Sequence, residues 1–279
     1  AREAQVPALL DAYQIPYTFA DPLVLALTLD KGLTKRVVRD LGLPTPDFCV
    51  VQTESDIAAV HVPLPLFVKP LAEGTGKGIN GQSKVRTREE LKRACRRILK
   101  TFGQPALVEV FLPGREFTVG IVGTGQDAKA LGTMEVILLP EAEAHAYSYL
   151  NKKRYEEFVR YVRVEGPAAR EAEQVGLAAW RGLGCRDGGR VDLRAAADGT
   201  IHFLEVNPLA GLNPKDSDLP ILCRHLGIAY NELIGMIMDS ALKRIRPAAS
   251  HPGPASNRRL RVGRQTDGPQ PAGRSPTPA

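Results

Sequence analysis

The segment that most constrains the fold of this chain is a polar hairpin at residues 189–211, with the sequence GRVDLRAAADGTIHFLEVNPLAG. Asp198 and Gly199 are typical turn residues, and the residues on both sides predict strands at 190–194 and 201–206. Because side chains alternate between the two faces of a strand, the polar ones gather on one face. On the first strand these are Arg190, Asp192 and Arg194, and on the second we expect Glu205 and Asn207 to share one face with Phe203.

An antiparallel pairing across this turn places Asp192 opposite positions 203 to 205, so that Asp192, Glu205 and Asn207 converge. Oxygen ligands without cysteine or histidine suit Mg²⁺. Arg190 beside them could stabilise a transferring phosphoryl group. The alternative is a solvated outer face of a sheet, but the strand closes at Pro208, as at a built site. The opposite face is apolar through Val191, Leu193, Leu204 and Val206.

Residues 66–81, LFVKPLAEGTGKGING, predict a strand that ends at Lys69 and continues into a glycine-rich loop. Glycine lets backbone N–H groups approach a phosphate closely, and Lys69 and Lys77 add positive charge, so the pattern favours a phosphate-binding lid. The GKGING segment fits the dinucleotide fingerprint in form, but no helix follows it, and Lys77 lacks the Ser or Thr of a P-loop. A mobile surface hairpin is the alternative.

Residues 107–119 predict two strands joined by an apolar bend that Glu109 and Glu116 flank. One acid at such a bend could accept a hydrogen bond from an adenine amine and the other from ribose hydroxyls. Glutamates are also common on ordinary surfaces, so this segment alone does not define a site.

Hydrophobic periodicity predicts helices at 31–42, 88–102 and 167–182, and two more helices that end near Ile245. The apolar face of the first carries Leu33, Val37, Val38 and Leu41. Further strands are expected at 48–51, 66–68, 107–110, 117–121 and 130–139, and residues 141–165 are interpreted as a long polar loop. Since strands and helices do not alternate regularly, the order predicts α+β layers in two lobes.

Length and cysteine usage exclude several classes of protein. A chain of 279 residues fits two domains of ordinary size, and no apolar run reaches the roughly 18 residues of a membrane span. No basic-then-apolar leader opens the sequence, which predicts that no secretory signal is present. Four widely spaced cysteines without a CxxC pair predict reduced thiols and a cytoplasmic location.

The net charge of +6 is concentrated at the C-terminal end. Residues 247–279 hold five arginines, one aspartate and seven prolines, which leaves +2 for the rest of the chain. Such a composition cannot bury enough apolar surface to offset its ordering entropy, so we expect a disordered basic tail. A basic arm that binds a partner is the alternative, but without aromatic residues or a regular pattern nucleic acid is not an expected partner.

The motifs occur in the order found in the ATP-grasp enzymes, and more narrowly the sequence resembles the D-alanine–D-alanine ligase family. The resemblance covers about residues 1–245 and rests on Asp30-Lys31, Val68-Lys69-Pro70, Glu73-Gly74-Thr75, Glu109 with 115–119, 189–192 and 204–207. It implies an ATP-grasp fold of two α+β lobes, a central lobe at 31–113 and a C-terminal lobe with a magnesium site at 114–246. Residues 1–30 would be the remnant of an N-terminal substrate domain that is otherwise largely missing, and 247–279 the tail.

The resemblance also implies how ATP and metal are held. Lys31 and Lys69 would contact ATP phosphates, and the loop with Glu73, Gly74, Thr75 and Gly78 would close over the β- and γ-phosphates. Glu109 and the backbone of Phe111 and Leu112 would hold adenine, and Glu116 the ribose. Two Mg²⁺ ions, with Mn²⁺ as an alternative, would be bound by Asp192, Glu205 and Asn207.

The implied reaction joins two D-alanines through an acylphosphate, as in the synthesis of peptidoglycan precursors. Arg190 and the amide of Gly211 would stabilise the tetrahedral intermediate, and Ser217 with Arg190 would hold substrate. Thr75 and Lys152 stand at two further catalytic positions. The expected partners are small amino-acid substrates and, for the full-length protein, a second copy in a homodimer, with no membrane.

The sequence departs from the family pattern at three places. Thr75 stands where the family has a serine, Lys153 replaces the second tyrosine of a Tyr-Glu-Ala-Lys-Tyr loop, and one residue is inserted between Gly211 and Ser217. Two alternatives therefore stay open: a ligase for another amino acid or a hydroxy acid, and a truncated protein that binds nucleotide without turnover.

Overall fold

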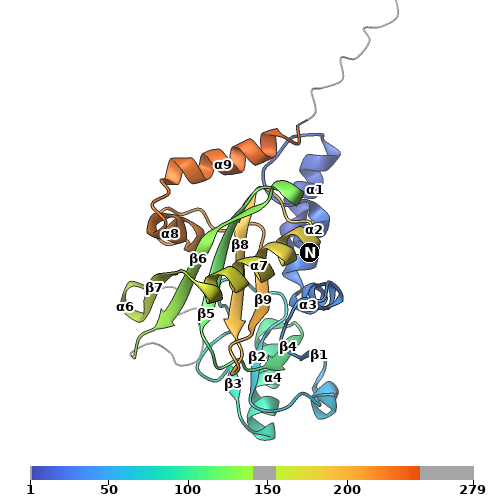
Figure 1. Cartoon of the computed structure of the whole chain (residues 1–279). Helices are drawn as coiled ribbons and strands as arrows, with labels where there is room; N and C mark the ends of the chain where they lie inside the picture. The colour runs from blue at the N-terminus through green and yellow to red at the C-terminus, as the bar shows by residue number, and fades with distance from the viewer. Residues whose placement is uncertain (1, 141–154, 246–279) are drawn as a thin grey trace, which may run out of the picture. The chain divides into compact units, whose positions relative to one another are not determined.

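The computed structural model describes residues 2–140 and 155–245, whose strands form two antiparallel sheets (Figure 1). The smaller sheet has the order β1-β4-β2-β3 and consists of β1 (Phe48–Val51), β2 (Leu66–Pro70), β3 (Lys84–Val85) and β4 (Ala106–Val110). The larger sheet has the order β7-β6-β5-β8-β9 and consists of β5 (Glu116–Val122), β6 (Lys129–Leu138), β7 (Val159–Val164), β8 (Gly188–Ala195) and β9 (Ile201–Asn207). The predicted α+β class is confirmed.

The smaller sheet is covered on one face by α4 (Arg88–Phe102), beside the short helix η2 (Glu54–Ala59). Thr87 caps α4 by accepting a hydrogen bond from the Glu90 N–H at 3.1 Å, and Gly103 ends it with φ of +58°. Leu66 and Val68 point toward α4, so alternation turns Phe67 and Lys69 to the other face. The helix predicted at 88–102 is confirmed to the residue.

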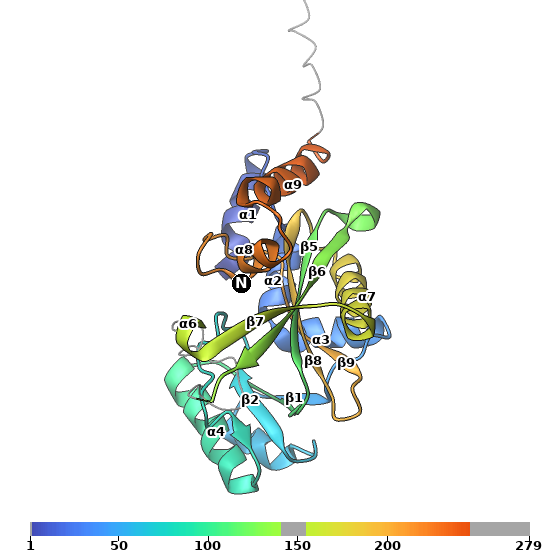
Figure 2. The ribbon, with the colours of Figure 1, turned by 60° about the vertical axis from the view of Figure 1, so that its left-hand side comes forward.

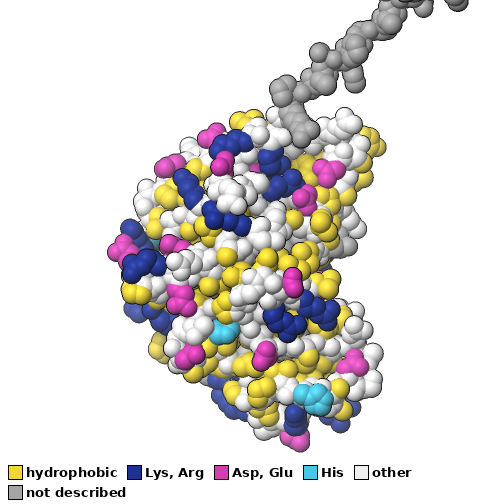
Figure 3. All heavy atoms as spheres, turned by 45° about the vertical axis from the view of Figure 1, so that its right-hand side comes forward, with side chains coloured by type: hydrophobic (Ala, Val, Ile, Leu, Met, Phe, Trp, Pro, Cys, Tyr) yellow, Lys and Arg dark blue, Asp and Glu magenta, His cyan; other side chains and the backbone are white. Residues whose placement is uncertain are grey.

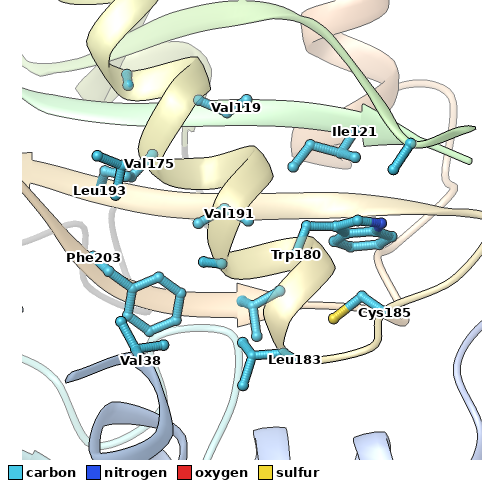
Figure 4. Packing of buried hydrophobic residues seen from close by; sticks show 14 of the residues in the cluster. Val38, Val119, Ile121, Val175, Trp180, Leu183, Cys185, Val191, Leu193 and Phe203 are labelled. Atoms are coloured by element: carbon cyan, nitrogen blue, oxygen red, sulfur yellow. The ribbon is translucent and has the colours of Figure 1, made fainter. Parts of the chain in front are cut away.

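The larger sheet is covered on one face by α7 (Pro167–Gly182), whose Trp180 is fully buried (Figure 4). The same core includes residues of α2 (Pro22–Leu29) and α3 (Lys31–Asp40). Figure 4 shows Val38 of α3 beside Phe203 of β9 in this core. On the opposite face α8 (Asp218–His225) packs against β5 and β6, and α9 (Tyr230–Leu242) against β5. Gly120 makes this close approach feasible, because a Cβ there would lie 2.6 Å from the Leu222 side chain. The two views in Figures 1 and 2 show these layers, with η1 (Arg2–Ala4) and α1 (Gln5–Ala12) beside α2.

The apolar face predicted for α3 is confirmed for Val38, which is part of the core, and for Val37, which packs against it, but it is wrong for Leu33 and Leu41. Leu33 and Leu41 are 45% and 43% exposed, while Lys31, Lys35 and Val38 are buried. The rest of the buried face borders a polar interior in which lysine ammonium groups meet carboxylates, so hydrophobic periodicity identified only part of the buried stripe.

The long polar loop predicted at 141–165 is also wrong for its second half. Residues 155–164 form α6 (Tyr155–Phe158) and β7, which pairs with β6 at the edge of the larger sheet. The sequence of β7, VRYVRV, carries the charges that suit an edge strand exposed to water, and these charges gave the segment its polar character. Residues 141–154, with Lys152, and the predicted tail at 247–279 lie outside the described residues.

Basic and acidic side chains are interspersed with apolar ones over the face shown in Figure 3. Among the described residues, every helix is too short or too polar to cross a membrane.

Candidate active site

A cleft lies between the polar faces of the two sheets and encloses about 880 Å³, part of it open to solvent. The smaller sheet contributes Phe67, Lys69 and Glu109, and the larger one Glu116, Thr118, Asp192, Arg194, Leu204 and Glu205. Lys31 at the start of α3 and the glycine-rich loop complete the lining.

A row of three buried charges runs from the cleft wall, where Lys69 and Glu109 lie, to Lys35 behind it. Glu109 pairs with Lys69 at 2.7 Å through Oε1 and with Lys35 at 2.9 Å through Oε2. Burial alone would raise the pKa of Glu109, but the attraction of both ammonium groups outweighs it and the pKa is lowered. Burial lowers the pKa of Lys35 to about 8 although Glu109 opposes the shift. Sequence analysis missed Lys35, whose only signal is its spacing of four residues from Lys31 and three from Val38.

The carboxylates of the hairpin meet as predicted, since Asp192 pairs with Glu205 in the β8–β9 register. The prediction for Phe203 is wrong. A bulge between Asp192 and Leu193 places Phe203 opposite Leu193 in the buried core and turns Leu204 toward the cleft. One extra residue in β9 thus reverses the alternation on one side of the bulge and leaves Glu205 pointing to the site.

Asp192 is held by neighbours on three strands. It accepts hydrogen bonds from Thr118 Oγ1 at 2.9 Å and from Asn207 Nδ2 at 3.1 Å, and it pairs with Arg190. Arg190 also lies 3.3 Å from Asp218. Burial alone would lower the pKa of Arg190, but these two carboxylates outweigh it and raise the pKa, so the guanidinium is a permanent cation.

The same residues fit a hard divalent cation as a partial ligand set. Within the described part of the chain, no cluster of three His, Cys, Asp or Glu residues is placed to hold a metal ion. Asp192 and Glu205 supply two carboxylates, and a turned-over side-chain amide of Asn207 would present its oxygen in place of Nδ2. Such a cation would need further oxygens from a bound ligand or water, as Mg²⁺ usually has.

The glycine-rich loop stands at the mouth of the cleft. Glu73, Gly74, Gly76 and Lys77 line the cleft, and the Lys31 ammonium donates to the Glu73 carbonyl oxygen at 2.6 Å. Gly78 does not line the cleft but packs on Pro70, with φ of +84°. Its position anchors the loop on β2.

The far end of the cleft is apolar with charged edges. Phe111 and Leu112 line it, and Glu116 pairs with Arg194 at 3.1 Å. The guanidinium of Arg194 lies 5.2 Å and the ammonium of Lys84 3.8 Å from the centre of the Phe111 ring. Sequence analysis placed Arg194 on the correct face but gave it no role.

A second pocket shares Lys31, Glu73, Gly74 and Glu205 with the first. Other predicted site residues that line it are Thr75, Arg190, Asn207, Gly211 and Ser217. The closeness of its walls depends on glycine, because a Cβ on Gly211 would lie 2.6 Å from Ser217 Oγ. The structure therefore gathers every predicted site residue around two adjoining pockets, apart from Gly78 and the undescribed Lys152.

The two antiparallel sheets with the cleft between them are arranged as in the ATP-grasp fold. Two solved structures share this fold. The D-alanine–D-alanine ligase of Bacillus anthracis in complex with ATP matches 86% of this chain and 75% of its own at 23% identity and a TM-score of 0.68. The match to the VanG D-Ala:D-Ser ligase of Enterococcus faecalis covers 85% of this chain and 68% of that protein, at 21% identity and a TM-score of 0.70.

The sequence comparisons identify the family. The family described as D-ala D-ala ligase C-terminus matches residues 37–239. The D-alanine–D-alanine ligase of Bordetella petrii is 34% identical over 244 residues, which are 86% of this chain and 72% of that protein. The chain belongs to the D-alanine–D-alanine ligase family.

Proposed function

We propose that this protein is an ATP-dependent carboxylate–amine ligase that joins two D-alanines in the synthesis of peptidoglycan precursors. The observation that carries the proposal is the pair of adjoining pockets, one lined by Lys69, Phe111 and Glu116 and one by Arg190 and Ser217, with shared walls at Lys31 and Glu205. The names of the relatives agree with it.

ATP occupies the cleft between the sheets. Adenine lies at the apolar end beside Phe111 and Leu112, with Glu109 behind it, and the ribose lies at Glu116. The phosphates lie at Lys31 and Lys69, under the loop that contains Glu73, Gly74, Thr75 and Gly78. Gly78 acts there as the anchor of the loop on Pro70.

Asp192, Glu205 and Asn207 hold the metal, for which two Mg²⁺ ions are proposed, with Mn²⁺ as the alternative. Bound Mg²⁺ neutralises phosphate charge and orients the transferring group. Thr118 keeps Asp192 in position by its hydrogen bond to Oδ1.

The second pocket binds the amino acids. A carboxylate oxygen of the first amino acid attacks the γ-phosphorus of ATP, and the bond between that phosphorus and the β,γ-bridging oxygen breaks. The products of this step are ADP and an acylphosphate. The amine of the second then attacks the acyl carbon, gives up a proton, and phosphate departs with the bond electrons. Arg190 and the Gly211 N–H stabilise the oxyanion, and Ser217 holds the second carboxylate. Lys152 and Thr75 stay proposed catalytic residues.

The setting of the enzyme is proposed from its chemistry. Four free cysteines favour the reducing cytoplasm. Homodimerisation, the absence of nucleic acid among the partners, and the lobe boundaries at 31–113 and 114–246 stay predictions.

One alternative has a specific observation in its favour, since the VanG structure is named for D-Ala and D-Ser. A different second substrate, such as D-serine or a hydroxy acid, would use the same first step. The nucleotide-binding protein without turnover is the remaining alternative.

The test is phosphate release and product mass with Mg-ATP and D-alanine alone or paired with D-serine, D-lactate or L-alanine. We expect D-alanyl-D-alanine as the main product, abolished by Asp192→Asn. The matched control is Asp198→Asn in the exposed turn of the same hairpin, which should retain activity. A mixed product would favour the second substrate named in it, and thermal stabilisation by Mg-ATP without product would favour the protein without turnover. No effect of Mg-ATP would refute the proposal.

A further inference from the structure

Lys35 is a fully buried lysine that does not line either pocket and has no role in the proposed reaction. Its ammonium is 0% exposed and lies behind the cleft wall, on α3. A buried cation is costly unless its hydrogen-bonding capacity is met. Lys35 forms an ion pair with Glu109 Oε2 (2.9 Å) and donates hydrogen bonds to Thr45 Oγ1 (2.9 Å) and to the Phe203 carbonyl oxygen (3.4 Å).

The arrangement of the three charges is asymmetric with respect to the cleft. Each oxygen of Glu109 has its own lysine, and only Lys69 and Glu109 line the cleft. Together Lys35, Glu109 and Lys69 carry a net charge of +1. Without Lys35 the remaining pair would be neutral, and the Lys69 ammonium would have its charge compensated by Glu109.

We propose that Lys35 is a positioning residue for the triphosphate: it balances Glu109, so that the positive charge of Lys69 stays available to an anionic ligand in the cleft. The proposal rests on the proposed function, because it assigns the cleft to ATP. Thr45 supports this proposal, since its hydroxyl accepts a hydrogen bond from the Lys35 ammonium and donates one to the Phe203 carbonyl oxygen at 3.0 Å. These bonds fix the ammonium against β9, so it cannot approach the ligand itself.

The test compares affinity for Mg-ATP with affinity for adenosine, by calorimetry at pH 7, in variants that change only this charge balance. Lys35→Met makes the net charge 0, Glu109→Gln makes it +2, and the double variant restores +1. The ratio of the two affinities cancels any change in adenine binding, which matters because Glu109 borders the adenine end.

We expect the ratio of Mg-ATP affinity to adenosine affinity to be higher in Glu109→Gln than in wild type, and equal in wild type and the double variant. In Lys35→Met the ratio should be about tenfold lower than in wild type, as expected for the loss of one poorly screened charge near a phosphate. Lys92→Met, at an exposed position of α4, removes one charge far from the row and should leave the ratio unchanged.

The outcomes separate the two proposals. If wild type binds neither ligand, the proposed function fails. If wild type binds Mg-ATP but Lys35→Met weakens both ligands equally, or the double variant does not recover the ratio, Lys35 is only structural and the inference is overturned. Should Lys35→Met alone fail to fold, Glu109→Gln against the double variant still tests it, because both lack the unpaired carboxylate. Equal ratios in those two would overturn it.

Discussion

Replacing Gly78 by alanine tests whether the glycine-rich loop must rest on β2 in order to hold nucleotide. Gly78 has φ of +84°, a left-handed conformation that side chains disfavour. A Cβ added there would lie 2.4 Å from Pro70 Cγ and 3.0 Å from Phe102 Cζ. Neither neighbour can yield easily, since Pro70 is a rigid, buried ring in the strand.

The cost follows from two contributions. The left-handed backbone costs an alanine about 1–2 kcal/mol, and the overpacking against Pro70 about 1–3 kcal/mol. The loop can avoid both by lifting off β2 without unfolding the sheet. The melting temperature should therefore change little, while the free energy of ATP binding should become less favourable by at least about 2 kcal/mol, which is roughly a 30-fold loss of affinity.

The assay is the KM for Mg-ATP at saturating amino acid, together with the melting temperature. Gly81→Ala is the matched control, because a Cβ there meets nothing within 4 Å and Gly81 is not among the glycines with positive φ. We expect a roughly 30-fold rise in KM for Gly78→Ala and less than a twofold rise for Gly81→Ala. Equal KM values for the two variants would refute the anchoring argument.

Three further changes have expected outcomes. Thr118→Val keeps the shape but removes the 2.9 Å hydrogen bond to Asp192, so the Mg²⁺ concentration for half-maximal activity should rise about tenfold, and unchanged values would count against this support. Asp187→Asn removes the charge of a fully buried carboxylate that pairs with the partly exposed Arg244, and it should cost about 3 kcal/mol in urea unfolding; Asp127→Asn, in an exposed pair, should leave stability unaltered, and equal losses would contradict the argument. In native protein Cys49, half-buried, should react first with a thiol reagent, because burial raises the pKa of the other three thiols strongly; more than one fast thiol would contradict this.

The elements that sequence predicted well are those in which local signals agree with the packing. The helices at 88–102 and 167–182 were predicted to the residue, because each has a clear stripe. The helix at 88–102 also has a threonine cap, and Pro167 opens the other. In α3 the hydrophobic pattern and the packing disagree, because the core that this helix borders is partly ionic. From sequence alone, a lysine on its buried face is predicted to be exposed to solvent. Lys35 could be recognised only once Glu109 was seen beside it.

The hairpin shows a second limit. The turn at Asp198 and Gly199 fixed the pairing well enough to bring Asp192 to Glu205, but strict alternation predicted the wrong face for Phe203. A bulge is selected by the neighbouring layers, because Phe203 fits the core beneath α7 and α3 and Leu204 has no place there. Period-two reasoning has no means of locating the extra residue from one sequence.

Cations of the cleft and of the adjoining second pocket have carboxylate partners in the described structure. Lys31 faces Glu205 at 3.4 Å, Arg190 pairs with Asp192, and Lys69 with Glu109. A polyanion alone would have to displace those carboxylates, and a divalent cation alone would have to displace the lysine and arginine. On the proposed function, when both enter together Asp192 and Glu205 would turn to the metal as Lys31 and Arg190 turn to phosphate, and each exchange would remove the cost of the other. The pairing would therefore favour the metal–nucleotide complex over either component alone.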